Sequence, residues 1–255
     1  MTQGVALLTG ANRGIGLETA RRLAARGYRV LLGTRTLERG RGAAPGLVDQ
    51  GINAQAAQLD VSDDASAARA AELVAGLTDR LDAFVNNAGI SSSTRTRSLP
   101  SETDLADMHA VYETNVFGIV RVTNAFLHLL RRARAARIVN VSSEVGSVAC
   151  TTSDASPISS TQPVAQYPSS KAAVNMLRAQ DARELAETPI RVNAANPGLT
   201  DTDLTSHRGI RPVERDAEPI VHLATLPDDG PSGALYRHVW TREGDGDGGY
   251  GVLPW

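Results

Sequence analysis

Lysine and cysteine are almost absent from this sequence. Of the 26 lysine and arginine residues among 255, only Lys171 is a lysine, and Cys150 is the one cysteine. A single cysteine excludes an intramolecular disulfide and a zinc site built from cysteines. A chain that otherwise uses arginine keeps lysine where a compact, titratable cation is needed, so Lys171 becomes a candidate functional residue.

Excess charge and long apolar runs are also lacking. The formal net charge of −2 gives no electrostatic reason to expect binding to nucleic acid or to an anionic membrane. No apolar stretch approaches the length that spans a bilayer, and Met1–Gly4 lacks the basic segment that begins a signal peptide. We therefore expect a cytoplasmic protein. The preference for arginine and alanine is typical of a GC-rich bacterial genome.

A glycine-rich turn near the N-terminus predicts a phosphate site. Val5–Thr9 reads as a buried strand, and Leu17–Arg26 has the pattern of an amphipathic helix. In Gly10–Gly16, which joins them, small residues let the backbone approach a pyrophosphate, and the helix N-terminus supplies N–H groups. The spacing is G-x-x-x-G-x-G rather than the generic G-x-G-x-x-G, so a glycine turn without a ligand is the alternative.

Arginines near the end of the second predicted strand favour one cofactor over another. Arg29–Thr34 reads as this strand, and Arg35 follows it without a nearby carboxylate. In a dinucleotide-binding fold this end faces the adenosine ribose, where an acid binds a free 2′-hydroxyl and an arginine accommodates a 2′-phosphate. With Arg13 in the glycine turn, the pattern favours NADP over NAD, although a single arginine is a weak signal in so arginine-rich a chain.

Strands and helices alternate along the rest of the chain, and polar or glycine residues follow each strand. This order predicts a parallel sheet with its site at the carboxyl ends of the strands. We expect one α/β domain over residues 1–255, a Rossmann-like doubly wound fold with a mostly parallel seven-stranded sheet and helices on both faces. The further expected elements are strands at Ala54–Leu59, Ala83–Val85, Arg137–Val141 and Ile190–Asn196, and a long helix over Asp104–Arg132.

Tyr167 and Lys171 are four residues apart, so on a helix both side chains project from one face. Pro168 is compatible with a first helical turn, because N–H groups there have no acceptor within the helix and the absent N–H of proline costs no hydrogen bond. Reduction of a carbonyl needs a proton for the developing alkoxide, and a cation one turn away would lower the pKa of the Tyr167 phenol. An exposed tyrosine and lysine on an ordinary helix are the alternative for so short a pattern.

Taken in order, these stretches resemble the short-chain dehydrogenase/reductase family over nearly the whole chain. The matching stretches are Thr9–Gly16 (TGANRGIG), Asp60-Val61, Asn86–Gly89 (NNAG), Asn115, Ser143, Tyr167–Lys171 (YPSSK) and Asn196–Thr202 (NPGLTDT). Arg13, Arg35 and the stretch Asp228–Gly233 are most similar to the NADPH-dependent carbonyl reductases of that family.

The resemblance implies roles for particular residues. Tyr167 would be the proton donor and acceptor, Lys171 its cationic partner, Ser143 a hydrogen-bond donor to the substrate oxygen, and Asn115 the holder of a water that links Lys171 to solvent. Ser142 is the alternative to Ser143, and a purely structural tie between helix and sheet is the alternative for Asn115. The residues implied to bind NADP(H) are Gly10, Asn12, Arg13, Gly14, Ile15, Gly16, Arg35, Asp60, Val61, Asn87, Ala88, Gly89, Tyr167, Lys171, Pro197, Gly198, Thr200 and Thr202. Asn86 and Asn87 are expected to combine contacts that fix the sheet with contact to the cofactor.

Three regions are expected to surround a substrate. The stretch 151–166 is rich in Ser, Thr and Pro, reads as a loop, and separates Ser143 from Tyr167; we expect it to control access of the substrate. Ile90–Leu99 and the C-terminal region 200–255 complete the pocket. Gly244–Gly249 has alternating acids but lacks the downstream glutamate of a calcium loop, and we expect a flexible tail segment there. Tyr250, Leu253 and Trp255 are expected to fold back over a pocket or a partner subunit. The histidines lack metal-ligand spacing, so no metal site is expected.

The sequence thus predicts an NADPH-dependent oxidoreductase that interconverts a ketone or aldehyde and an alcohol by hydride transfer. An NADP(H)-binding sensor without turnover is one alternative, although such proteins lose the tyrosine or lysine that this chain keeps. An epimerase or dehydratase with the same Tyr and Lys is another. The resemblance is compatible with a homo-oligomer, either dimer or tetramer, and with a monomer as the alternative.

Overall fold

A single mixed sheet forms the centre of the protein, whose computed structural model describes residues 4–48, 53–92, 98–156, 158–240 and 247–254. The strand order is β3-β2-β1-β4-β5-β6-β7-β8, parallel from β3 to β7, with β8 antiparallel to β7. This order is that of a Rossmann-like α/β fold. The strands are β1 Val5–Thr9, β2 Arg29–Thr34, β3 Ala54–Gln58, β4 Ala83–Asn86, β5 Arg137–Val141, β6 Arg191–Asn196, β7 Leu235–Trp240 and β8 Asp247–Val252.

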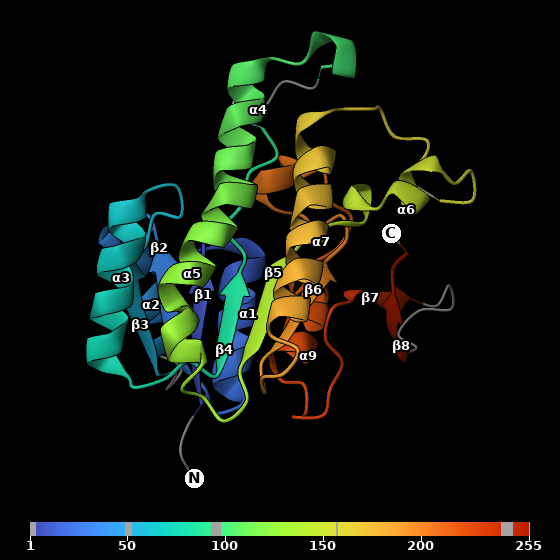
Figure 1. Ribbon diagram of the computed structural model, residues 1–255. Helices are drawn as coiled ribbons and strands as arrows, with labels where there is room; N and C mark the ends of the chain where they lie inside the picture. Colours follow the sequence, from blue (N-terminus) through green and yellow to red (C-terminus); the bar gives the residue numbers. More distant parts are fainter. Residues whose placement is uncertain (1–3, 49–52, 93–97, 157, 241–246, 255) are drawn as a thin grey trace.

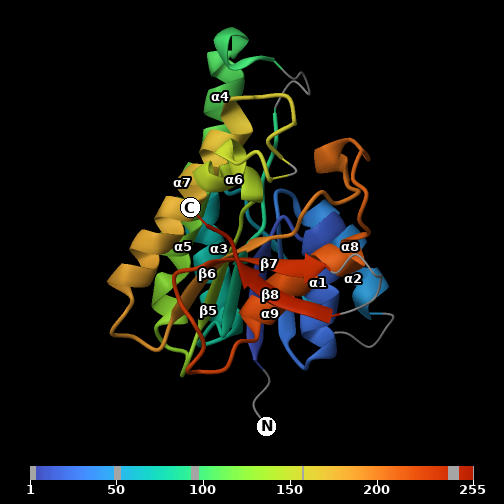
Figure 2. The same ribbon diagram turned by 90° about the vertical axis from the view of Figure 1, so that its right-hand side faces the viewer.

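Helices cover both faces of the sheet. In Figure 1, α3, α5 and α7 lie in front of the strands, while α1 and α9 lie behind them; Figure 2 shows the same layers from the side of β8. The α-helices are α1 Gly14–Ala25, α2 Leu37–Val48, α3 Asp64–Leu77, α4 Leu105–Tyr112, α5 Gly118–Leu130, α6 Val148–Thr152, α7 Gln166–Glu184, α8 Val213–Asp216 and α9 Glu218–Ala224. Short 3₁₀ turns lie at Pro100–Glu102, Glu144–Gly146 and Asp203–Thr205, and a π-helical turn, Glu113–Phe117, joins α4 to α5.

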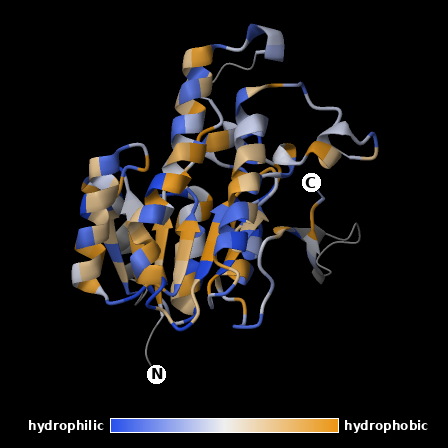
Figure 3. Cartoon of the chain, viewed as in Figure 1, coloured by the Kyte–Doolittle hydropathy of each residue, from blue (hydrophilic) through white to orange (hydrophobic). Residues whose placement is uncertain are grey.

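The apolar core is divided between the two faces because successive strand side chains point in opposite directions. Leu7 on β1 belongs to the cluster that contains Phe84 and Phe126, whose rings are 5.5 Å apart. Leu8, the next residue, belongs to the cluster on the other face with Leu23 of α1. The strands are therefore hydrophobic on both sides, as Figure 3 shows at the centre of the molecule, and a buried parallel sheet results.

The predicted fold class is confirmed, but the strand count of seven is wrong because β8 adds an eighth strand. Its residues 247–249 include part of the stretch expected to be a flexible tail; residues 244–246 lie outside the described residues. Pairing with β7 orders this glycine-rich segment despite its low intrinsic strand preference. The terminal segment folds back onto its own chain: Leu253 is buried against Ala194 and Leu235, and Tyr250 stacks on His222 at 3.7 Å. Trp255 is outside the described residues.

The carboxyl ends of the parallel strands meet along one edge of the sheet, and α4 and the segment around α6 extend above that edge (Figure 1). The long helix expected over Asp104–Arg132 is present as α4, the π-helical turn and α5. The expected loop 151–166 begins within α6 and ends where α7 starts. Within the described part of the chain, no helix combines the length and the apolar character needed to cross a membrane.

Candidate active site

The turn between β1 and α1 requires glycine for two physical reasons. Gly10 and Gly14 have φ angles of 64° and 55°, which side-chain-bearing residues rarely adopt. A Cβ on Gly16 would lie 2.4 Å from Nδ2 of Asn87, too close for any other residue. That amide braces the turn by donating to the carbonyl oxygens of Thr9 (2.9 Å) and Gly10 (3.2 Å). The first turn of α1 contains no acid, so its N-terminus fits a phosphate group of a dinucleotide.

The residues at the end of β4 and just after it hold the sheet edge together and approach Lys171. Asn86 donates from Nδ2 to Oδ1 of Asn140 (2.8 Å), which cross-links β4 to β5, so its role is structural. The N–H of Ala88 donates to Oγ1 of Thr9 at 2.9 Å. A Cβ on Gly89 would lie 3.8 Å from Nζ of Lys171. Thus Asn87 and Ala88 fix the glycine turn, and Gly89 leaves space beside Lys171.

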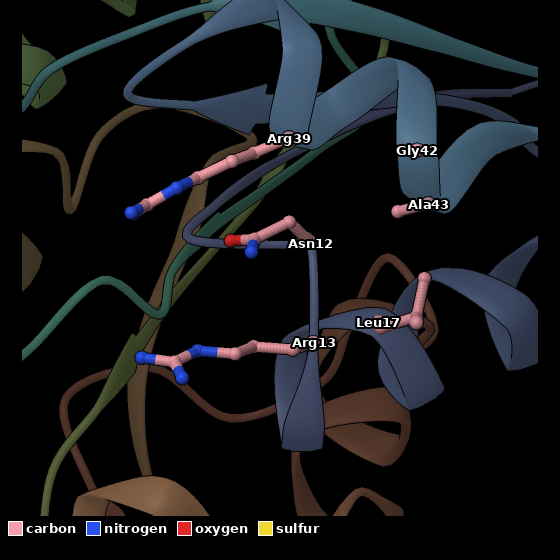
Figure 4. A pocket seen from close by; sticks show the side chains of 6 residues that line it. All are labelled: Asn12, Arg13, Leu17, Arg39, Gly42 and Ala43. Atoms are coloured by element: carbon pink, nitrogen blue, oxygen red, sulfur yellow. The ribbon is translucent and has the colours of Figure 1, made fainter.

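A cavity of about 620 Å³ lies between the glycine turn and α2. Figure 4 shows Arg13 and Arg39 on either side of Asn12, extending in the same direction. Arg39, which the sequence analysis did not single out, lines this cavity, whereas the predicted Arg35 is exposed beyond β2 and is not among the lining residues. The only sequence signal for Arg39 is its place on a helix one turn after Arg35. The lining residues are Asn12, Arg13, Leu17, Arg39, Gly42 and Ala43.

Two predicted cofactor residues follow β3. The Asp60 carboxylate accepts hydrogen bonds from the N–H (3.0 Å) and hydroxyl (2.6 Å) of Ser62, so it shapes the turn into α3. The side chain of Val61 is buried against Gly118 of α5: a Cβ added to this glycine would lie 3.0 Å from Cγ2 of Val61. Ile15 packs against the core cluster behind β1. Each has a structural role here, and contact with a cofactor stays a prediction.

The segment after β6 crosses over the glycine turn. Gly198 has a φ of 102°, and a Cβ there would lie 2.5 Å from Nη1 of Arg211. The Cγ2 atom of Thr202 would be 3.4 Å from a Cβ on Gly14, so this threonine lies at the turn, and its contact with a pyrophosphate stays a prediction. An ion pair joins Arg13 to Asp203 beside it. Pro197 precedes Gly198 in the same segment, and Thr200 is buried.

Ser143, Tyr167 and Lys171 come together at the carboxyl end of β5. Helix α7 begins at Gln166, with Pro168 in its first turn, and carries both Tyr167 and Lys171. The Ser143 hydroxyl lies near the Tyr167 phenol, where it acts to lower the pKa of the phenol. Nζ of Lys171 lies 5.5 Å from the centre of the Tyr167 ring and donates to the carbonyl oxygen of Val141 at 2.8 Å. The structure therefore gathers three of the four predicted catalytic side chains in one cluster.

Burial dominates the protonation of this cluster. It raises the pKa of Tyr167 to about 12, although the neighbouring Ser143 hydroxyl acts in the opposite direction. Burial also lowers the pKa of Lys171 to about 8 because the ammonium loses hydration. The net lowering of the Tyr167 pKa that was expected from Lys171 is wrong for this structure, because burial outweighs any stabilisation of the phenolate. Instead the phenol keeps its proton at neutral pH, which suits a proton donor.

The neighbouring serine has a different environment. Ser142 is buried, and its hydroxyl donates to Oδ1 of Asn175 on α7 at 2.6 Å. The Ser142 hydroxyl also donates a longer hydrogen bond, of 3.4 Å, to the backbone carbonyl oxygen of Lys171. Ser142 thus ties β5 to α7, whereas Ser143 contacts Tyr167. The geometry favours Ser143 over Ser142 as the residue that meets a substrate oxygen.

Asn115, in the π-helical turn, is a structural tie as well as a candidate catalytic residue. Its Nδ2 donates to the carbonyl oxygen of Ile90 (2.9 Å) and to Oγ of Ser170 (3.1 Å). Its Oδ1 accepts from the N–H of Ile90 at 2.9 Å. The side chain is fully buried. These contacts support the structural alternative for the side-chain amide, and the predicted water relay stays a prediction.

Comparison with known proteins agrees with this geometry. Residues 4–211 match the family model of the short chain dehydrogenases, so the chain belongs to this family of oxidoreductases. The chain is 38% identical over 233 residues to "Short-chain dehydrogenase anuI" of Penicillium roqueforti (strain FM164), covering 88% of this chain and 90% of that protein.

Solved structures show the same fold with a bound dinucleotide. A gluconate 5-dehydrogenase from Burkholderia cenocepacia J2315 in complex with NADP and tartrate superimposes with a TM-score of 0.80 at 25% identity, over 93% of this chain and 94% of that one. The Pseudomonas aeruginosa RhlG/NADP active-site complex gives 0.78 at 29% identity, over 92% and 94%. The glycine turn and the cavity beside it therefore belong to a fold that holds NADP in these relatives.

Proposed function

We propose that the protein is an NADPH-dependent reductase that interconverts a ketone or aldehyde and an alcohol. The observation that carries this proposal is the cluster of Ser143, Tyr167 and Lys171 at the carboxyl end of β5. A protonated phenol beside a hydroxyl and a buried amine is suited to donate a proton to a developing alkoxide.

The residues divide the reaction between them. A bound nicotinamide cofactor would supply the hydride to the carbonyl carbon. Tyr167 gives its proton to the carbonyl oxygen; the transfer is favourable because an alkoxide is a stronger base than a phenolate. Ser143 donates a hydrogen bond to the same oxygen and stabilises its charge in the transition state. Lys171, one helical turn away, stabilises the phenolate that remains on Tyr167 until it is reprotonated.

The preference for NADPH is proposed from the charges at the cavity beside α2. A 2′-phosphate needs cationic hydrogen-bond donors, and both Arg13 and Arg39 line this cavity. Arg13 is already paired with Asp203, so Arg39 is proposed as the principal contact of the phosphate. The relatives solved with NADP support the same cofactor.

Replacing Arg39 with alanine is expected to raise the KM for NADPH about 10- to 100-fold, because a charge-assisted hydrogen bond to the phosphate is lost. The KM for NADH should not change, since NADH lacks the 2′-phosphate. Initial rates with both cofactors measure the two effects. Arg41→Ala is the matched control, because Arg41 is exposed on the same helix and does not line the cavity. This substitution should leave both KM values unchanged. Equal losses with NADPH and NADH in Arg39→Ala would contradict the proposal.

The reaction itself is tested by following NADPH absorbance with a panel of ketones and aldehydes. Consumption of NADPH with formation of the matching alcohol supports the proposal. Binding of NADPH without turnover of any carbonyl would instead indicate a sensor. Conversion of a sugar or a hydroxy compound without net change in NADPH would indicate an epimerase or dehydratase.

A further inference from the structure

A buried carboxylate on α4 connects three segments near the catalytic tyrosine. Asp107 is only 2% exposed. Its Oδ2 accepts a hydrogen bond from Oγ of Ser92, in the segment after β4, at 2.9 Å. The same oxygen accepts a second bond, from Nε2 of Gln166 at the start of α7, at 2.8 Å. A carboxylate this deeply buried must be held by such donors, so both contacts are strong constraints.

Gln166 immediately precedes Tyr167 and is the first residue of α7. Its side chain is 3% exposed, and within the described part of the chain Oε1 has no hydrogen-bond partner. The amide is thus anchored through Nε2, which donates to Asp107. The N-cap residue of α7, Ala165, makes no side-chain hydrogen bond to the helix. The bond between Gln166 and Asp107 therefore holds the start of this helix against α4.

The same bond fixes one end of the segment expected to border the substrate. Near its other end, Oγ of Ser147 donates to the carbonyl oxygen of Pro254 at 2.6 Å. Between these points, the described residues 153–156 and 158–165 include local turns, in which the N–H groups of Ser156 and Thr161 donate to carbonyl oxygens three residues earlier. The path of this segment into Tyr167 is thus set where Gln166 meets Asp107.

We propose that Asp107 and Gln166 are positioning residues for Tyr167. Their hydrogen bond holds the first turn of α7 against α4, which keeps the Tyr167 phenol in place beside Ser143. This inference rests on the proposed reductase function for its kinetic consequence. Its structural consequence, an ordered start of α7, is independent of the reaction.

Swapping the amide of Gln166 and the carboxylate of Asp107 between the two positions tests their hydrogen bond directly. In Gln166→Glu, two carboxylates face each other at a buried contact, where a shared proton can join them; at a pH high enough to ionise both they repel, so at that pH the first turn of α7 should shift or fray. We expect kcat to fall about 10-fold or more, since misplacement of a reacting group by about 1 Å is costly, while the Kd for NADPH stays unchanged. Adding Asp107→Asn restores an amide–carboxylate hydrogen bond with its direction reversed. The double variant should therefore recover most of the lost kcat.

Hydrogen exchange of the peptide over residues 166–171 gives a readout that does not depend on turnover. Exchange should be faster in Gln166→Glu and return toward wild type in the double variant. Glu102→Gln is the control, because it removes one carboxylate from an exposed position before α4. It should change neither kcat nor hydrogen exchange. Unchanged exchange in Gln166→Glu, or a double variant no better than the single one, overturns the proposal. Absence of carbonyl turnover in the wild type would count against the reductase function alone, because the exchange measurement still decides the positioning role.

Discussion

Replacement of Tyr167 by phenylalanine is expected to lower kcat for carbonyl reduction by about 10²- to 10⁴-fold, the usual contribution of a positioned general acid. The phenyl ring keeps the packing but has no proton to give to the alkoxide. Binding of NADPH should persist, because the glycine turn and the cavity beside α2 are unchanged. Initial rates of NADPH consumption give kcat, and a fluorescence titration gives the Kd of the cofactor.

Tyr112→Phe is the matched control, because it removes the same kind of hydroxyl from a tyrosine at the end of α4. It should retain wild-type kcat. If Tyr167→Phe kept more than about a tenth of the wild-type kcat, another group would supply the proton. Such a result would contradict the role proposed for Tyr167 from its position beside Ser143 and Lys171.

The sequence was sufficient to predict which strand ends meet. Ser143 follows β5 and Gly198 follows β6, and parallel pairing of these strands places both at one edge of the sheet. The four-residue spacing of Tyr167 and Lys171 predicted one helical face, and α7 confirms it. These predictions worked because they depend on chain order and on helical or strand periodicity, which are local properties of the sequence.

Properties that depend on tertiary surroundings were missed. The strand β8 contains three glycines in DGGYGV and forms because β7 offers it an edge, not because of its own preference. The pKa of Tyr167 was expected to fall, but burial raises it, and burial is set by packing around the side chain. Arg39 reaches the cavity only because α2 turns it toward the glycine turn. None of these facts is encoded in a short motif.

The contact between Asp107 and Gln166 illustrates the same limit. The two residues are 59 positions apart in the chain. Neither carries a motif, and Gln166 precedes Tyr167 at a position that a pattern such as Y-x-x-x-K leaves unspecified. Only the approach of α4 to α7 shows that a buried carboxylate meets the amide next to the proposed proton donor.

Replacement of Lys171 by methionine is expected to impair the reaction and to stabilise the fold. Loss of the ammonium removes the charge that stabilises the Tyr167 phenolate, and kcat should fall about 10²-fold or more. Burial lowers the pKa of Lys171 from 10.5 to about 8, so below pH 8 the folded protein bears the cost of a poorly hydrated ammonium. That cost corresponds to about 3 kcal/mol of unfolding free energy. Loss of the hydrogen bond to Val141 offsets about 1 kcal/mol, which leaves a net gain of about 2 kcal/mol at pH 7.

The pH dependence of this gain distinguishes a charge effect from better packing. Between pH 8 and 10.5 the unfolded chain holds a proton on Lys171 that the folded protein has released, so the stability contribution of Lys171 rises with pH in this window. The advantage of Lys171→Met should therefore shrink as the pH rises from 8 to 10.5, where the lysine is neutral in both states. Urea unfolding of both proteins across this range measures it. Arg183→Met, on the exposed side of α7, is the control and should change stability little at any pH. A stability gain independent of pH would show that packing, and not the buried charge, limits the stability of the wild-type protein. A gain that follows the pKa of Lys171 would show that the fold accepts a destabilising ammonium where the proposed reaction needs one.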